Sequence, residues 1–202
     1  THIGHSEKVF NMKRLLLIII LTLSFQTLTK ADDIREFQIE GMSIGDSLLI
    51  NMSKNEIDST KIYFKTTKHG IKKEYSKIFI TKNLNQYDYV AVYFKSNDKN
   101  YIIQSIAGRI EFKDNIEECY ELQKVIVNDI RKIAVEAKEW SATRNLSGYK
   151  GKQLAFNFDY NNQSGITVSC YDYDDDKKRI DRISVFVSSS DYADFQFNRA
   201  YK

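Results

Sequence analysis

The densest group of potential metal ligands is a run of aspartates near the C-terminal end. Asp172, Asp174 and Asp176 stand at alternate positions, like the first three ligands of a calcium-binding loop. Lys177 then stands where such a loop needs glycine, and Ile183 where it needs a bidentate glutamate. The same composition is normal for a solvated hairpin turn. We expect a turn without metal, and keep the three aspartates as the candidate ligands of the alternative.

Two of these carboxylates could also perform acid–base chemistry. Glycoside-cleaving enzymes can work with a single pair of Asp or Glu side chains. Asp172 and Asp174 share one strand parity, so they would point to the same side of a strand. A carboxylate-based periplasmic hydrolase is therefore the alternative function, and it would need a concave pocket lined by paired acids.

Other catalytic patterns are missing from the sequence. His69 is the only histidine after residue 31, and it stands in a turn-like context beside Gly70. There is no G-x-S-x-G, H-E-x-x-H or G-x-G-x-x-G pattern. Gly41 and Gly45 are not followed by the Lys and Ser or Thr of a phosphate loop. We expect no catalytic residues, no metal and no cofactor. These observations favour a protein that is not an enzyme, without deciding the matter.

The chain has two cysteines, Cys119 and Cys170. In an exported protein they most simply form one disulfide, which would tie the start of a predicted helix to a predicted strand. The alternative is a reactive thiol at Cys119, where a helix N-terminus lowers the pKa. No C-x-x-C pair accompanies it, so we expect the disulfide.

The first 31 residues resemble an export signal. A basic Met12-Lys-Arg14 precedes the apolar run Leu15–Phe25, and Thr29-Lys-Ala31 offers small residues for cleavage. The run is shorter than the roughly 20 residues that span a bilayer. We expect a signal peptide at 12–31, upstream or mis-called sequence at 1–11, and one mature domain at 32–202. The protein would then be periplasmic or secreted. The alternative is that the leader is not cleaved, in which case the protein would contact the membrane only through this segment.

The charge of the mature chain argues against nucleic acid as a partner. The full sequence has 30 basic and 27 acidic residues, of which residues 1–31 hold four and one. The mature chain therefore keeps 26 of each and no net charge. Nucleic-acid binding depends on neutralising phosphates with excess positive charge. An unidentified protein or small ligand is the expected partner.

Tyrosines are concentrated in the first half of the mature chain. Tyr87, Tyr89 and Tyr93 share one strand parity. An exposed row of this kind would suit a protein or a ligand with polar and apolar parts. The other interpretation is a row that the long helix or its own neighbours cover. These three tyrosines are the candidate binding residues.

The residue pattern predicts the elements that would position these side chains. A short helix is expected over Gly41–Ile50 with Ser43 as N-cap, and a capping box at Ser53–Glu56 starts another helical turn. A long amphipathic helix is expected from Asp114 to about Lys138. A polar loop over Ser141–Lys152 would follow it.

Seven strands are expected around the long helix, because Tyr, Phe, Ile and Val are frequent in short runs that turn residues separate. They cover Lys61–Thr67, Tyr75–Thr81, Tyr87–Lys95, Tyr101–Phe112 (with Gly108 as a bulge or bend), Gln153–Tyr160, Gly165–Tyr173 and Ile180–Ser188, and the tail Asp191–Lys202 would add a short strand or turn. The fold class is α+β: antiparallel sheet or sheets packed against one long helix and a short N-terminal helix. The order also suggests two similar helix-plus-meander halves, without a residue-level repeat.

Three stretches carry a resemblance to known proteins. These stretches are the sequence from Ala31 to Leu49, which follows a Leu/Ile-rich leader, and the segments Ser105–Ile110 and Ile116-Glu-Glu-Cys-Tyr120. Together they resemble a family of uncharacterised exported proteins of marine alphaproteobacteria. The resemblance covers most of the mature chain and implies a Gram-negative periplasmic setting, but no activity. Gly41-Met-Ser with Asp46 is also similar to helix openings of periplasmic α+β modules related to outer-membrane assembly lipoproteins and β-lactamase inhibitors, without their lipid-bearing Cys and their Pro.

These observations predict an exported protein that acts as a non-catalytic periplasmic binding or interaction module. Its expected contact surfaces are the Tyr-rich first strands and the helix at Gly41–Leu49. A flat aromatic face would favour this function, and a cleft lined by acids would favour the hydrolase.

Overall fold

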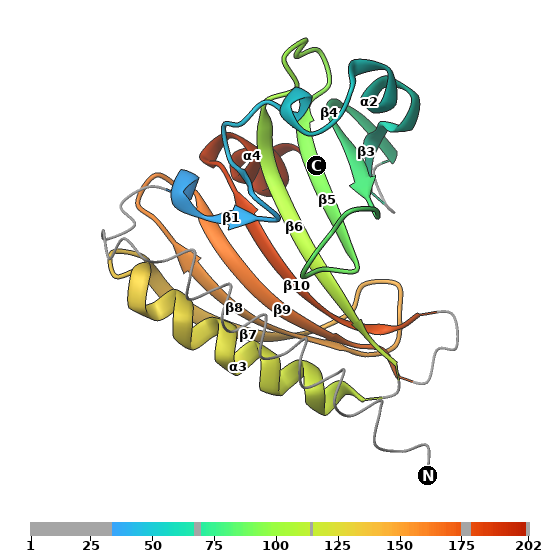
Figure 1. Ribbon diagram of the computed structural model, residues 1–202. Coiled ribbons are helices and arrows are strands. Elements are labelled where there is room, and N and C mark those ends of the chain that lie inside the picture. The colour runs from blue at the N-terminus through green and yellow to red at the C-terminus, as the bar shows by residue number, and fades with distance from the viewer. Residues whose placement is uncertain (1–33, 67–69, 114, 175–178, 201–202) are drawn as a thin grey trace.

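The computed structural model describes residues 34–66, 70–113, 115–174 and 179–200 (Figure 1). Within these residues the chain forms a large antiparallel sheet of eight strands. In their order across the sheet they are β3 (Ile62–Thr66), β4 (Gly70–Ile80), β5 (Tyr89–Lys95), β6 (Ile103–Phe112), β10 (Asp181–Ser188), β9 (Gly165–Asp172), β8 (Lys152–Asp159) and β7 (Lys138–Asn145). The predicted α+β class with an antiparallel sheet is confirmed.

Two meanders, β3 to β6 and β7 to β10, meet where β6 pairs with β10. In-register partners in an antiparallel sheet point to the same face. Val92, Ile106, Val187 and Ile166 therefore lie on one face. This face is apolar across most of the sheet, because most of the residues that β5, β6, β10, β9 and β8 direct to it are Val, Ile, Leu or Phe.

Helix α3 (Ile116–Ile133) covers this apolar face over the second meander (Figure 1). Its buried stripe includes Ile126 and Ile130. Gln123 is only 1% exposed, and its Nε2 donates to the carbonyl oxygens of Leu154 and Val168, both at 2.9 Å. This single polar side chain thus attaches α3 to two neighbouring strands, β8 and β9.

The N-terminal segment joins the same core on the same face. It consists of the 3-10 turns η1 (Ile34–Glu36) and η2 (Leu48–Ile50), the two-stranded ribbon β1 (Gln38–Ile39) and β2 (Met42–Ser43), and helix α2 (Lys54–Thr60). The Ser53–Glu56 capping box opens α2 as expected. Leu48 and Ile57 are completely buried against the sheet.

The opposite face is covered over part of the first meander by the C-terminal segment. Helix α4 (Ser190–Asp194) and the π-helical turn η3 (Phe195–Ala200) place Tyr192 and Phe195 against Tyr75 and Phe64. The rings of Tyr75 and Tyr192 meet edge to face, with centroids 5.0 Å apart. This second, smaller core is aromatic, and the tail that forms it is helical instead of the expected strand or turn.

The long helix and the two similar halves are not matched in detail. α3 has 18 residues and ends at Ile133, where a turn from Ala134 to Ala137 follows. The first meander is preceded by the seven-residue α2 instead of a comparable helix. Residues 138–145 form the edge strand β7, although a helix end and a polar loop were expected there. Nearly all side chains of β7 are exposed. The strand therefore forms through its backbone pairing with β8, and its sequence has no alternating hydrophobic pattern that would predict it.

Two further expectations are wrong. The Gly41–Ile50 helix does not form, because Gly41 and Gly45 adopt φ values of +76° and +94° that turn the chain. Asp46 does accept the backbone N–H of Ser43, at 2.8 Å, but within a turn. Gly108 is not a bulge either: it pairs in register with Val90 and Val185.

Candidate functional site

The two cysteines form the expected disulfide. Cys119 at the start of α3 is bonded to Cys170 in β9, with Cα atoms 6.0 Å apart. Both residues are fully buried. The bond therefore attaches α3 to the sheet, and the alternative of a reactive thiol at Cys119 is wrong for this structure.

The three candidate tyrosines do not form one surface. Tyr87 precedes β5, and its ring lies against Gly108 on the apolar face. Tyr93 is only 7% exposed and packs beside Phe64 and Tyr192 beneath α4. Tyr89 alone lies on the part of the opposite face that α4 leaves open. Shared strand parity did not predict a common exposed surface, because the strand begins after Tyr87 and the C-terminal segment covers Tyr93.

The aspartate cluster is also divided. The side chain of Asp172 lies on the α3 side of the sheet, where it accepts a long hydrogen bond (3.4 Å) from the Tyr120 hydroxyl. Asp174 is exposed beyond the end of β9. Asp176 and His69 lie outside the described residues. Among the residues that are described, no group of three or more His, Cys, Asp or Glu could hold a metal ion.

A different group of side chains comes together on the sheet face opposite α3. We call it the basic aromatic face; it consists of Lys77, Phe79, Tyr89, Arg109, Tyr171, Tyr173 and Arg182. Strand register assembles its centre: Tyr89 is opposite Arg109, Arg109 is opposite Ser184, and Arg182 is opposite Tyr171. Four neighbouring strands, β5, β6, β10 and β9, thus contribute to one surface.

Aromatic rings hold both guanidinium groups of this face. The Cζ atom of Arg109 lies 5.4 Å from the ring centroid of Tyr89. The Cζ atom of Arg182 lies 4.9 Å from the ring of Tyr171 and 5.3 Å from that of Tyr173. These two rings are nearly parallel, with 14° between their planes. Cation–π contacts of this kind orient a guanidinium without neutralising its charge.

Within the described part of the chain, neither guanidinium has a carboxylate partner. The Nε atoms of Arg109 and Arg182 are buried and make no hydrogen bond. Among the described residues, no Asp or Glu oxygen lies within 4.0 Å of either side chain. Glu111 is the cross-strand neighbour of Arg182, but it is exposed and forms no such pair. The positive charge of each guanidinium is therefore not neutralised by a neighbouring carboxylate, so an oxyanion that approached this face would be attracted to it.

Lys77 adds a third positive charge at the β4 end of the face. Its Nζ atom lies 5.1 Å from the Phe79 ring centroid and 6.0 Å from that of Tyr93. Burial lowers the pKa of the Lys77 ammonium group, and the nearby charge of Arg109 lowers it further.

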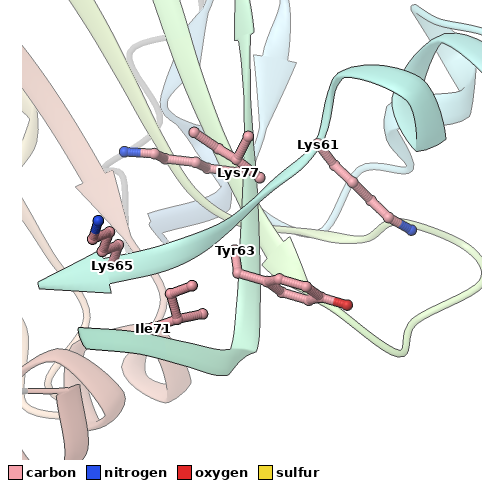
Figure 2. Close-up of a pocket in the computed structure, with 6 residues that line it drawn as sticks. Lys61, Tyr63, Lys65, Ile71 and Lys77 are labelled. Atoms are coloured by element: carbon pink, nitrogen blue, oxygen red, sulfur yellow. The ribbon is translucent and has the colours of Figure 1, made fainter. Parts of the chain in front are cut away.

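Lys77 also lines a shallow hollow beside the β3–β4 hairpin (Figure 2). The hollow has a volume of about 520 Å³ and is lined by Lys61, Ile62, Tyr63, Lys65, Ile71 and Lys77. Figure 2 shows Lys77 pointing away from Lys61, which is ion-paired with Asp58 at 2.7 Å. Ile62 and Lys77 join the hollow to the basic aromatic face at the sheet edge, whereas Tyr63 is in register with Ser76, the partner of Phe94, and so lies on the other face.

The β7–β8 connection borders the other end of the face. Gly151 has a φ of +126°, and a Cβ there would lie 2.1 Å from the carbonyl oxygen of Asp172. Only glycine lets this connection lie so close to the end of β9. The approach brings Tyr149 edge to face with Tyr173, at 6.2 Å, and Arg179 stacks on Tyr149 with its Cζ atom 4.2 Å from the ring centroid.

Arg109 and Arg182 were not among the predicted site residues. Each lies in a predicted strand, on the parity opposite to its apolar neighbours, and this was the available signal. Tyr171 and Tyr173 show the same parity relation to Cys170. The pairing of β6 with β10, which brings the two arginines together, joins segments about 70 residues apart and has no local signature.

Comparison with known proteins adds no relative from which a function could be inferred. A scan against protein-family models, a search of curated proteins and a search of solved structures each gave no match. No helix in the described part of the chain is long and apolar enough to cross a membrane. Function is therefore inferred from the site itself.

Proposed function

We propose that this protein is an exported, non-catalytic binding module that recognises an anionic partner through the basic aromatic face. Its export is supported by the signal-like segment at 12–31 and by the Cys119–Cys170 disulfide, because disulfides persist in oxidising compartments. The resemblance to exported proteins of marine alphaproteobacteria is in agreement with a periplasmic location.

The observation that carries the proposal is the pair Arg109 and Arg182. Both guanidinium groups are held by tyrosine rings, and neither is ion-paired with a carboxylate among the described residues. A carboxylate or phosphate oxygen would form charge-assisted hydrogen bonds with them. Since the mature chain has no net charge, this attraction is local to the face and selects a partner by its own distribution of charge.

The carboxylate-based hydrolase has weaker support. Asp172 is hydrogen-bonded to Tyr120 on the α3 side of the sheet, and the basic aromatic face lies on the other side. The side chains of that face are arginine, lysine, tyrosine and phenylalanine, which suit recognition better than acid–base catalysis by carboxylates.

Capture from a cell-envelope extract would test the proposal. The bait is the exported full chain, compared with Arg109→Gln/Arg182→Gln and with the matched control Arg131→Gln. Arg131 lies on α3, paired with Glu139 at 2.6 Å, away from the basic aromatic face. We expect the wild type and the control to retain an anionic partner that the double variant loses, and retention to weaken with salt. Equal capture by all three baits would contradict the proposed function.

A further inference from the structure

The basic aromatic face also carries exposed apolar side chains among its cations. Phe79 is 41% exposed and lies on the face beside Tyr89, with ring centroids 6.3 Å apart. Ile62 is 48% exposed and is in register with Lys77, so both point to this face. A ligand that covers this area must therefore supply apolar groups as well as anions.

The positive charges are too widely spaced for a single small oxyanion. Lys77 lies on β4, Arg109 on β6 and Arg182 on β10, and these strands follow one another with β5 between the first two. At about 4.8 Å per strand, Lys77 and Arg182 lie on strands roughly 14 Å apart. A ligand that reaches both must carry at least two anionic groups.

We infer that the partner is a protein, which presents an acidic segment with an apolar side chain beside its carboxylates. This inference rests on the proposed function and specifies its partner. The carboxylates bind Arg109 and Arg182, and the apolar side chain packs near Phe79 and Ile62. Acidic polysaccharides and polyphosphate offer repeated anions but no apolar anchor. Arginine and tyrosine are also the residues that recur at the centres of protein interfaces.

The geometry of the arginines supports carboxylate recognition. A guanidinium binds a carboxylate through two parallel N–H donors, and neither arginine is ion-paired with a carboxylate among the described residues. One ring face of Tyr89 is already taken by Arg109, and Tyr171 and Tyr173 are shared with Arg182. These rings therefore orient cations and are less suited to stacking on a sugar.

Binding of defined probes tests the inference. We would measure fluorescence anisotropy of the full chain with an array of labelled 12-residue peptides, each with two or four Asp or Glu. The matched peptides replace the central Phe or Leu with Ser, or the acids with Asn and Gln. Polygalacturonate and vesicles containing phosphatidylglycerol are the competing anionic probes. We expect the acidic peptides with an apolar centre to bind at least about tenfold more tightly than both sets of matched peptides, and Arg109→Gln/Arg182→Gln to lose about tenfold or more. Arg131→Gln should bind like the wild type.

The outcomes separate the two proposals. If polygalacturonate or the vesicles bind as tightly as the best peptide and depend on Arg109 and Arg182, the protein partner is wrong while the anion-binding face stands. If no acidic peptide exceeds its neutral match, although the envelope extract still yields a partner that depends on these arginines, the acidic segment is wrong. If neither capture nor any anionic probe depends on them, the proposed function itself fails.

Discussion

Tyr87 occupies the space that Gly108 leaves open on the apolar face of the sheet. A Cβ atom on Gly108 would lie 2.5 Å from a ring carbon of Tyr87, well inside van der Waals contact. Glycine inside a strand usually weakens it, but here its missing side chain admits an aromatic ring into the core. The relationship explains why a glycine stands at a regularly paired position of a central strand.

Substituting Gly108→Ala should therefore destabilise the protein. Inserting one methyl group into this contact forces the Tyr87 ring or the strand to move, at a cost of about 1–3 kcal/mol in the free energy of unfolding. Urea unfolding at neutral pH would measure the loss. In the background of Tyr87→Ala the same substitution should cost much less, because the clash is gone. Equal losses in both backgrounds would show that the ring is not the obstacle.

Glu40 holds the segment that places Tyr87. Its carboxylate accepts the backbone N–H groups of Asn85, Gln86 and Tyr87, at 2.9, 2.6 and 3.1 Å. Glu40 itself adopts a φ of +52° in the β1–β2 turn. A turn in the N-terminal ribbon and a loop about 45 residues later are thus connected through a single side chain.

Replacing Glu40 with alanine should expose those three amides and weaken the fold. Hydrogen bonds to a charged acceptor contribute about 1.5–3 kcal/mol, and we expect a loss in that range. Hydrogen exchange should speed up at residues 85–87 before other loops respond. Glu36→Ala is the control, since Glu36 is exposed on the neighbouring turn η1. Unchanged exchange at residues 85–87 would contradict this role of Glu40.

The expected strands of both meanders were readable because their side chains alternate. Val90, Val92 and Phe94 face the core as their parity predicts. β7 was missed because its sequence, Lys138 to Asn145, has no buried face to read, and its pairing with β8 depends on tertiary context. The basic aromatic face was missed for a related reason: strand parity predicts which side of its own strand Arg109 occupies, but not that Arg182 lies on the next strand.

The disulfide should account for a large part of the protein's stability. Cys119 and Cys170 are 51 residues apart, and in the chain-entropy model a loop of that length contributes about 4 kcal/mol. The double variant Cys119→Ala/Cys170→Ala should lose approximately this amount in urea unfolding. Reduction of the wild type with dithiothreitol should give a similar loss. A thiol titration that finds two reactive cysteines in the unreduced, denatured protein would refute the bond.

The phenol of Tyr75, in the aromatic core beneath α4, should make the stability of the fold depend on pH in the alkaline range. Tyr75 is fully buried, and its hydroxyl makes no hydrogen bond. Burial raises the pKa of this phenol far above its usual value of 10, and the negative charges of Asp191 and Glu74 raise it further. Because the folded-state pKa exceeds the unfolded one, the contribution to stability is complete below pH 10 and is lost as the pH rises towards the folded value.

Tyr75→Phe tests this argument. At pH 7 the variant should be as stable as the wild type or up to about 1 kcal/mol more stable, since it removes a buried hydroxyl without a partner. Between pH 9 and pH 11 the wild type should lose stability more steeply than the variant, because only the wild type has this phenol to ionise on unfolding. Urea midpoints at both ends of that range, with Tyr63→Phe at an exposed position as the control, would measure the difference. Parallel pH profiles for wild type and Tyr75→Phe would show that the phenol ionises as readily in the fold as in the unfolded chain.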